Sequence, residues 1–234
     1  KPLYLGESIA PFRLLKPAEA VIPWSTKSAR LLDSASARDS GYNGLAEWLR
    51  QGEKLWNRHS KAKLTLLERL DKFHALMLQM PAPALRVIYT KSGTIAAAAA
   101  LLDRTSTIDH KLYWSGIADH HEARYLVAFL NSDALRRHVA PLQSRGQWGA
   151  RDFDKLLAGT IPPFDQSDHL HMDLAVQAAH AEKVAAAVVL PEDIHFIRAR
   201  GMIRDALRGD GVSMRIDALV ERILDGRKQA ISIS

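Results

Sequence analysis

Residues 85–114 read LRVIYTKSGTIAAAAALLDRTSTIDHKLYW, and this stretch decides the fold class. Residues 85–89 alternate and are rich in β-forming side chains, which predicts a strand. Residues 95–102 fit a helix or a strand, but Gly93 and the turn at 103–106 bracket them so closely that we predict a strand. Residues 107–114 follow as the third predicted strand. We therefore expect three consecutive strands.

Downstream of these strands the apolar spacing becomes helical. Asp119 is a candidate helix N-cap, with Glu122 three residues further on as in a capping box. Pro191 ends the longest predicted helix, and residues 209–211 (Gly-Asp-Gly) separate the last two predicted helices. The predicted helices cover about 119–130, 133–139, 167–190, 194–207 and 216–224.

Upstream of residue 85 two different patterns occur. Residues 2–24 contain short extended pieces broken by prolines, which argues against a helix there. Residues 45–59 and 64–80 have apolar side chains at helical spacing, with Arg50, Lys54 and Arg58 on other faces of the first helix. We predict an α+β fold: a curved mixed or antiparallel sheet in a domain over 1–165, a helical insertion at about 42–80, and a C-terminal helical segment over 166–234.

Composition limits the classes of function. The chain has 32 Lys and Arg against 26 Asp and Glu, a net charge of +6 that is compatible with a polyanionic partner. It has no cysteine, which excludes disulfides and thiolate metal sites and fits a cytoplasmic setting. No apolar run reaches the roughly 18 residues of a membrane span, so no membrane partner is expected. Because the sequence opens without Met in strand-like residues, we expect a fragment of a longer chain.

Known catalytic motifs are incomplete or missing in the sequence. Amino-directed DNA methyltransferases use an Asn/Asp-Pro-Pro-Tyr/Phe loop on the flipped base, whereas residues 161–164 place Ile161 at the polar position. No glycine-rich loop follows a predicted strand, so no cofactor is expected in this fragment. Histidines at 120–121 and at 169 and 171 lie at predicted helix starts, where capping and solvation explain them better than a metal does.

A magnesium-dependent nuclease is an alternative. Asp109 and Lys111 form an Asp-x-Lys pattern on a predicted strand, and Asp103 lies upstream. In such nucleases two carboxylates bind Mg²⁺ and the lysine supports the attacking water. The turn between Asp103 and Asp109 weakens this interpretation, and ordinary polar residues at a strand surface are the simpler one.

The remaining signal indicates nucleic acid. Arginine can contact guanine, glutamine can contact adenine, and both can contact phosphate. Such residues gather on the glycine-containing stretch 143–151, where Trp148 is a wedge, a stacking group or a packed loop anchor. A solvated basic face is the competing interpretation. The candidate DNA-binding residues are Arg145, Gln147, Trp148, Arg151 and Lys155, with Lys91, Arg104 and Lys111 on or between the strands.

Three pieces of sequence carry a family resemblance: YLVAFLNS at 125–132, QSRGQWGARDFDK at 143–155 and IPPF at 161–164. In this order they resemble the C-terminal target-recognition region of restriction–modification DNA methyltransferases, and more distantly the target-recognition domains of type I specificity subunits. They are similar to that family's "leucine-Asn-Ser" helix end, its glycine-Gln recognition segment and its exit into a spacer helix. Residues 5–13 also look like the segment that follows the catalytic domain in larger members.

The resemblance implies a module that binds double-stranded DNA and selects the sequence for a methyltransferase domain in the same parent chain. S-adenosylmethionine is then expected to bind that catalytic domain, with adenine as the expected target base. The family's catalytic motifs find no match here, so methyl transfer is not carried over to these residues. Besides the nuclease, a protein-interaction scaffold, in which the charge only solubilises the chain, stays open as an alternative.

Overall fold

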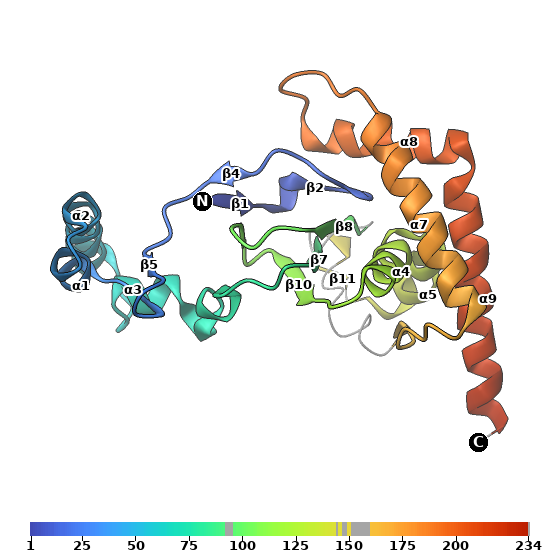
Figure 1. Cartoon of the computed structure of the whole chain (residues 1–234), viewed down its shortest axis with the longest axis horizontal. Helices are drawn as coiled ribbons and strands as arrows, with labels where there is room; N and C mark the ends of the chain where they lie inside the picture. Colours follow the sequence, from blue (N-terminus) through green and yellow to red (C-terminus); the bar gives the residue numbers. More distant parts are fainter. Residues whose placement is uncertain (92–95, 144, 147–148, 151–159, 234) are drawn as a thin grey trace. The chain divides into compact units, whose positions relative to one another are not determined.

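The computed structural model describes residues 1–91, 96–143, 145–146, 149–150 and 160–233, with side chains for 1–91, 96–141, 143 and 160–226. The chain divides into two compact units. Unit 1 comprises residues 1–2, 19–82 and 105–107, and unit 2 comprises residues 3–18, 83–104 and 108–234. The short strands β1 (Pro2–Tyr4), β4 (Ala18–Glu19) and β9 (Thr107–Ile108) each contain residues of both units. The labels are those of Figure 1.

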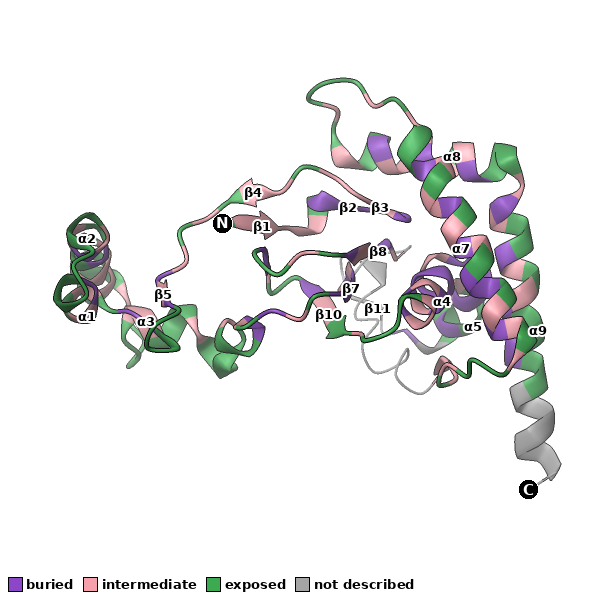
Figure 2. Ribbon diagram, viewed as in Figure 1, coloured by how far each residue is buried: buried purple, intermediate pink, exposed green. Residues whose placement is uncertain are grey.

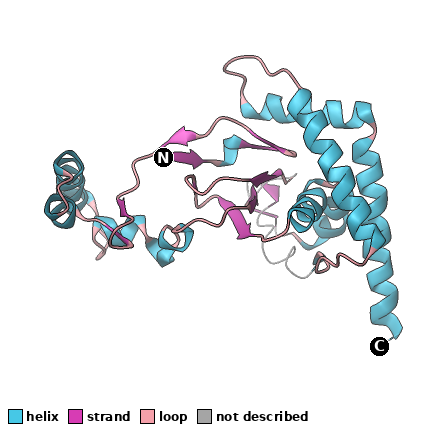
Figure 3. Cartoon of the chain, in the orientation of Figure 1, coloured by secondary structure: helices cyan, strands magenta, loops and turns pink. Residues whose placement is uncertain are grey.

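The α+β class predicted from the sequence is confirmed (Figure 3). The main sheet of unit 2 has the strand order β10-β7-β8, and both pairings are antiparallel. Its strands are β7 (Arg86–Thr90), β8 (Ala98–Leu101) and β10 (Leu112–Gly116).

The prediction of one continuous strand over 107–114 is wrong. It is divided into β9 and β10 by a turn over residues 109–111. The carboxylate of Asp109 accepts a hydrogen bond from the Lys111 backbone N–H at 2.9 Å, and the Asp109 carbonyl accepts one from Leu112 N–H at 3.0 Å. Side chains of Asp favour such local turns over a continuing ladder, which explains the break.

The alanine-rich strand β8 is buried on both faces. Ala98 belongs to the buried cluster that includes Phe129, whereas Ala97 and Ala99 belong to a second cluster with Ile9 and Ile88. Successive side chains of a strand point to opposite faces, so the two clusters lie on opposite sides of the sheet. Small side chains here allow close packing on each side.

The second of these clusters includes residues from the N-terminal strands. Strands β2 (Ile9–Ala10) and β3 (Arg13–Leu14) pair antiparallel after the short 3₁₀ helix η1 (Gly6–Ser8). Phe12, in the turn between them at a φ of 58°, donates its backbone N–H to the Ala98 carbonyl at 2.9 Å. This contact fixes the hairpin to the sheet.

Helices cover the other face of the sheet in unit 2 (Figure 1). Helix α7 packs on α4, α8 and α9, and α5 packs on α9. As predicted, Asp119 caps α4, accepting hydrogen bonds from the backbone of His121 and Glu122. Gly211, at a φ of 82°, is the single residue between α8 and α9. The helices are α4 (His120–Asn131), α5 (Asp133–Val139), η4 (Ala140–Leu142), α7 (His169–Ala187), α8 (Phe196–Asp210) and α9 (Val212–Ile233).

The compact units do not divide at residue 165, where we expected a domain boundary. Phe129 of α4, Leu174 of α7 and Ile216 of α9 belong to one buried cluster, together with Val87 and Ala98 of the sheet. Figure 2 shows buried residues on α4 and α7 within this part of the chain. The helices after residue 165 therefore complete the core of the same unit.

Unit 1 contains the predicted helical insertion, but one of its two helices differs from the prediction. Helix α2 is continuous, whereas the predicted helix over 64–80 breaks after α3, with φ of 61° at Phe73 and 57° at His74. The Asp71 carboxylate accepts hydrogen bonds from the backbone N–H groups of Leu76 and Met77, at 3.0 and 2.9 Å, and stabilises the break. The elements are β5 (Trp24–Ser25), β6 (Arg30–Leu31), α1 (Ser34–Asp39), α2 (Asn43–His59), α3 (Leu66–Leu70), η2 (Lys72–His74) and η3 (Met77–Gln79).

Candidate nucleic-acid interface

The predicted recognition stretch 143–151 contains a two-stranded ribbon. Strands β11 (Arg145–Gly146) and β12 (Gly149–Ala150) pair antiparallel, with Arg145 opposite Ala150 and Gly146 opposite Gly149. The side chain of Arg145 and the whole of Gln147, Trp148, Arg151 and Lys155 lie outside the described residues.

Two of the other candidates come together at one end of the sheet. The backbone N–H of Lys91 donates to the Lys111 carbonyl at 3.2 Å, just beyond the pairing of Thr90 with Leu112. The Lys91 ammonium lies 4.7 Å from the ring centroid of Tyr113, a cation–π contact. Lys111 is exposed. Strand pairing thus places two cations side by side.

Arg104 does not join them. It is exposed and follows β8, whose last residue, Leu101, pairs with Arg86. Arg86 and Thr90 mark opposite ends of β7, so about 13 Å of strand separates the two ends at 3.3 Å per residue. The candidates near the sheet therefore form two separate groups.

Several arginines of unit 2 stabilise the fold instead of forming a free basic surface. Arg86 is fully buried and donates to the Asp103 carbonyl at 2.6 Å, and burial lowers its pKa. Arg13 donates to the Ala185 and Val188 carbonyls at the C-terminal end of α7, at 3.0 and 2.7 Å. A cation there also interacts favourably with the helix dipole.

Arg200 of α8 has a similar structural role. Its guanidinium donates to the carbonyls of Gly6 and Ile9, at 2.5 and 2.8 Å, and so holds α8 to the N-terminal segment. Burial lowers the pKa of Arg200 to about 10. Such partners, nearly two hundred residues away in sequence, gave no signal in the sequence pattern.

The "leucine-Asn-Ser" helix end also has a structural explanation. The amide of Asn131 donates to the Ala98 carbonyl at 2.9 Å and accepts from the Ala98 N–H at 3.0 Å, as a neighbouring strand would. Ser132 caps α5 by accepting from the Leu135 N–H at 3.1 Å. The pair joins α4, α5 and the edge of β8.

The exit segment 161–164 packs against the same helix. The hydroxyl of Tyr125 donates to the Pro162 carbonyl at 3.0 Å, and the ring of Phe164 lies 5.4 Å from that of Tyr125. His171, expected to be a solvated polar residue at the start of α7, is instead buried and lies 4.7 Å from Tyr125, ring to ring. Its Nδ1 accepts from the Asp165 N–H at 3.0 Å, which explains the burial of a polar ring.

Among the described residues, no group of three His, Asp or Glu is arranged to hold a metal ion. The carboxylate of Asp109 contacts Lys111 N–H and the His110 ring within its own turn, and Asp103 accepts from Arg86 through its carbonyl. In the part of the chain that is described, these contacts give the nuclease alternative no specific support.

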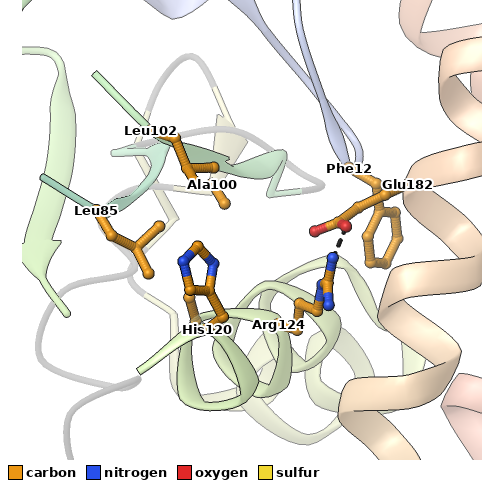
Figure 4. Close-up of a pocket in the computed structure, with 8 residues that line it drawn as sticks. Phe12, Leu85, Ala100, Leu102, His120, Arg124 and Glu182 are labelled. Carbon is orange, nitrogen blue, oxygen red and sulfur yellow. Dashed lines mark hydrogen bonds and ion pairs between the residues drawn. The ribbon is translucent and has the colours of Figure 1, made fainter. Parts of the chain in front are cut away.

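Unit 2 contains a cavity of about 260 Å³ beside α4 (Figure 4). Arg124 and Glu182 form an ion pair across it at 3.1 Å and so neutralise each other, and His120 lies at its side. The volume is below the roughly 300–1,000 Å³ of typical small-molecule sites. The lining residues are Phe12, Leu85, Ala100, Leu102, His120, Ala123, Arg124 and Glu182.

Comparison of the chain with models of known protein families finds no match, and comparison with the curated proteins finds none either. Within the described residues, no helix combines the length and the apolar character that crossing a bilayer requires.

Proposed function

We propose that this chain is the DNA-binding target-recognition module of a larger S-adenosylmethionine-dependent DNA methyltransferase of the restriction–modification type. It would hold double-stranded DNA and select the sequence presented to an adenine-specific catalytic domain of the same parent chain. S-adenosylmethionine would bind that catalytic domain, and the residues of this chain would supply DNA contacts.

The observation that carries the proposal is the β11–β12 ribbon inside the stretch that the sequence predicts as the reader. The major groove of DNA admits a two-stranded β-ribbon, where arginine and glutamine side chains can meet base edges. In the chain the ribbon comes after α5 and η4, and Asn131, at the end of α4, is hydrogen-bonded to the sheet while Ser132 caps α5. A site is more precise on rigid elements than on loops, so the packed elements that precede the ribbon support the proposal.

The test is selection of bound duplexes from a randomised library, followed by sequencing. The wild-type chain should enrich a preferred sequence. Arg145→Ala and Gln147→Ala should each relax the preference at particular positions, at about 1–3 kcal/mol per lost bidentate contact. Lys183→Ala, which removes an exposed cation of α7, is the control and should leave the sequence profile unchanged.

Thermal melts of each variant distinguish reading from folding. If Arg145→Ala lowers the melting temperature and keeps the sequence profile, Arg145 shapes the loop and does not read DNA. Absence of any enriched sequence for the wild type would contradict target recognition as the function.

A further inference from the structure

The positive charge of the chain is concentrated in unit 1. Unit 1 makes up less than a third of the chain, yet it has 11 Lys and Arg against 7 Asp and Glu, a net +4 of the total +6. Residues 50–63 alone contain five of these cations and one acid, Glu53. The net charge of unit 1 is therefore equal to that of one segment, the second half of α2 and the loop after it.

Three of these cations are arranged in a row. Arg50, Lys54 and Arg58 are four residues apart on α2, which places them on one stripe at about 6 Å intervals along the helix axis. All three are exposed, although Ala46, one turn earlier on the same four-residue spacing, is buried with Leu49, so the stripe leaves the buried face of α2 at Arg50. Lys61 and Lys63, also exposed, follow in the loop beyond the helix end at His59.

Four of these side chains are available to a ligand. Arg50 is paired with Glu47 at 2.6 Å, but the other four are exposed and make no ion pair with any residue that the structure describes. The helix dipole accounts for a cation in the last turn of α2, such as Arg58. It does not account for Lys61 and Lys63, which lie beyond the helix end. We name these four the α2 basic stripe: Lys54, Arg58, Lys61 and Lys63.

Local contacts fix the loop that presents Lys61 and Lys63. The indole N–H of Trp56 donates to the Leu64 carbonyl at 2.7 Å and ties the end of the loop back to α2. The hydroxyl of Ser60 accepts from the Ala62 N–H at 3.1 Å, and Thr65 caps α3 in a capping box with Glu68. These contacts hold the backbone of the loop in place before a ligand binds, which reduces the entropy lost on binding.

We propose that the α2 basic stripe binds the phosphate backbone of double-stranded DNA without sequence preference, as a contact separate from the predicted reader at 143–151. The inference rests on the proposed function for the choice of DNA as the polyanion. Several cations without ion pairs, on one helix and the loop that follows it, suit a polyanion with many phosphates, because each phosphate neutralised releases condensed counterions.

An anionic membrane surface is the competing partner for a basic helix. A helix that lies in a membrane interface buries its apolar face in the lipid. The apolar face of α2 is already used, since Ala46 and Leu49 form the core of unit 1 with Leu32 and Ala37. The burial of that face favours DNA. Trp48 and Leu55 are exposed on α2, so the vesicle measurement below tests whether lipid takes them up instead.

The experiment compares two quadruple variants of the whole chain that lose the same charge. One variant replaces the α2 basic stripe with alanine. The matched control replaces four exposed cations of unit 2 that make no ion pair with a described residue: Lys16, Lys183, Arg198 and Arg222. Binding of a fluorescent 30-base-pair duplex of random sequence is measured by anisotropy from 20 to 200 mM salt. Circular dichroism confirms that both variants are folded.

For the stripe variant, the slope of log affinity against log salt should become shallower by about 3 to 4, at 0.9 per phosphate contact. Its affinity at 100 mM salt should fall roughly 10- to 100-fold, whereas the control should change its slope by less than about one. Replacing Lys54, Lys61 and Lys63 with arginine should retain wild-type binding, because the charge is kept.

Equal losses in the two quadruple variants would overturn the inference, because net charge alone would then explain binding. Tighter binding of the wild type to vesicles containing anionic lipid than to DNA would also overturn it.

The inference and the proposed function can fail separately. If the stripe variant keeps its affinity for DNA while the library still yields an enriched sequence, the inference fails and the proposed function stands. If the stripe variant loses affinity but the wild type enriches no sequence, the proposed function fails and the inference stands. A wild type that binds no DNA at 20 mM salt would overturn both.

Discussion

The two units of the chain differ in how their folds are stabilised. Unit 2 has a continuous core in which Tyr125, Phe129 and Leu174 are fully buried. The core cluster of unit 1 consists of Leu32, Ala37, Ala46 and Leu49, and two of these four are alanines. Since apolar burial is the main favourable term in folding, unit 2 has much the larger source of stability.

The two units also differ in their surfaces, and here unit 1 has more of the exposed apolar side chains. Among the described residues, most of the exposed large apolar side chains belong to unit 1, and Phe73 (83%) and Leu78 (70%) are among the most exposed. A groove of about 500 Å³ lies beside Phe73, lined by Leu31, Leu64 and Met77 among others. Unit 1 also carries most of the net positive charge. The comparison indicates that unit 2 is built as a scaffold, whereas more of unit 1 is left available as surface.

The largest effect is expected in the core of unit 2. Phe129→Ala removes a fully buried ring that lies 4.9 Å from the ring of Tyr125. It should lower the free energy of unfolding by about 3–5 kcal/mol, from lost burial and the cavity left behind. Urea denaturation followed by circular dichroism measures this, with the exposed Val176→Ala as the control. A loss below about 1 kcal/mol would show that the cluster is not a tightly packed core.

A smaller and local effect is expected in unit 1. Leu49→Ala removes the largest buried side chain of α2 and should cost about 2–3 kcal/mol, the low end for leucine, because the cluster is small. Hydrogen exchange should speed up for the backbone amides of α1 and α2 and stay unchanged for α4 and α7. Leu55→Ala, which is exposed on the same helix, is the control. If α4 and α7 also lose protection, the two units fold as one.

The third prediction concerns the link between α4 and the sheet in unit 2. Asn131→Ala removes the partner of both the N–H and the carbonyl of Ala98, and should cost about 1–3 kcal/mol. Asn131→Asp keeps the acceptor and loses the donors, so it should be destabilising as well. Thermal melts measure both variants. A silent alanine variant would mean that water replaces the amide there.

The sequence predicted those elements of the fold that depend on neighbouring residues. Glycine and a polar turn delimited the alanine strand, and Asp119 marked the start of α4. The break after α3 was missed because neither Gly nor Pro lies between residues 64 and 80, and the hydrogen bonds of Asp71 form only in the folded turn. Local propensity has no access to such contacts.

The candidate site was predictable to a similar extent. Residue type alone selected Lys91, Arg104 and Lys111, but only the register of the strands shows that the two lysines meet and that Arg104 does not. On α2 the four-residue spacing of Arg50, Lys54 and Arg58 was visible in the sequence. That these three side chains are exposed became clear only in the structure, because Ala46, on the same four-residue spacing, is buried.

The smallest effect is expected from a charge cluster on the surface of unit 2, and it depends on pH. His180 Nε2 lies 2.8 Å from Asp210 Oδ1, and Arg215 donates to the same oxygen at 2.9 Å. The hydrogen bond with His180, and then that with Arg215, hold the pKa of Asp210 below its ordinary value of 3.8. A lowered folded-state pKa adds stability that is present above pH 3.8 and is lost as the pH falls through the folded value.

Asp210→Asn should therefore lower the melting temperature slightly at pH 6, and the difference in melting temperature from wild type should close as the pH falls from about 4 to 2. Asp205→Asn, at an exposed pair with Arg208, is the control and should show little difference at either pH. A gap that stays constant down to pH 2 would mean that the shape of the side chain, and not its charge, joins α7, α8 and α9.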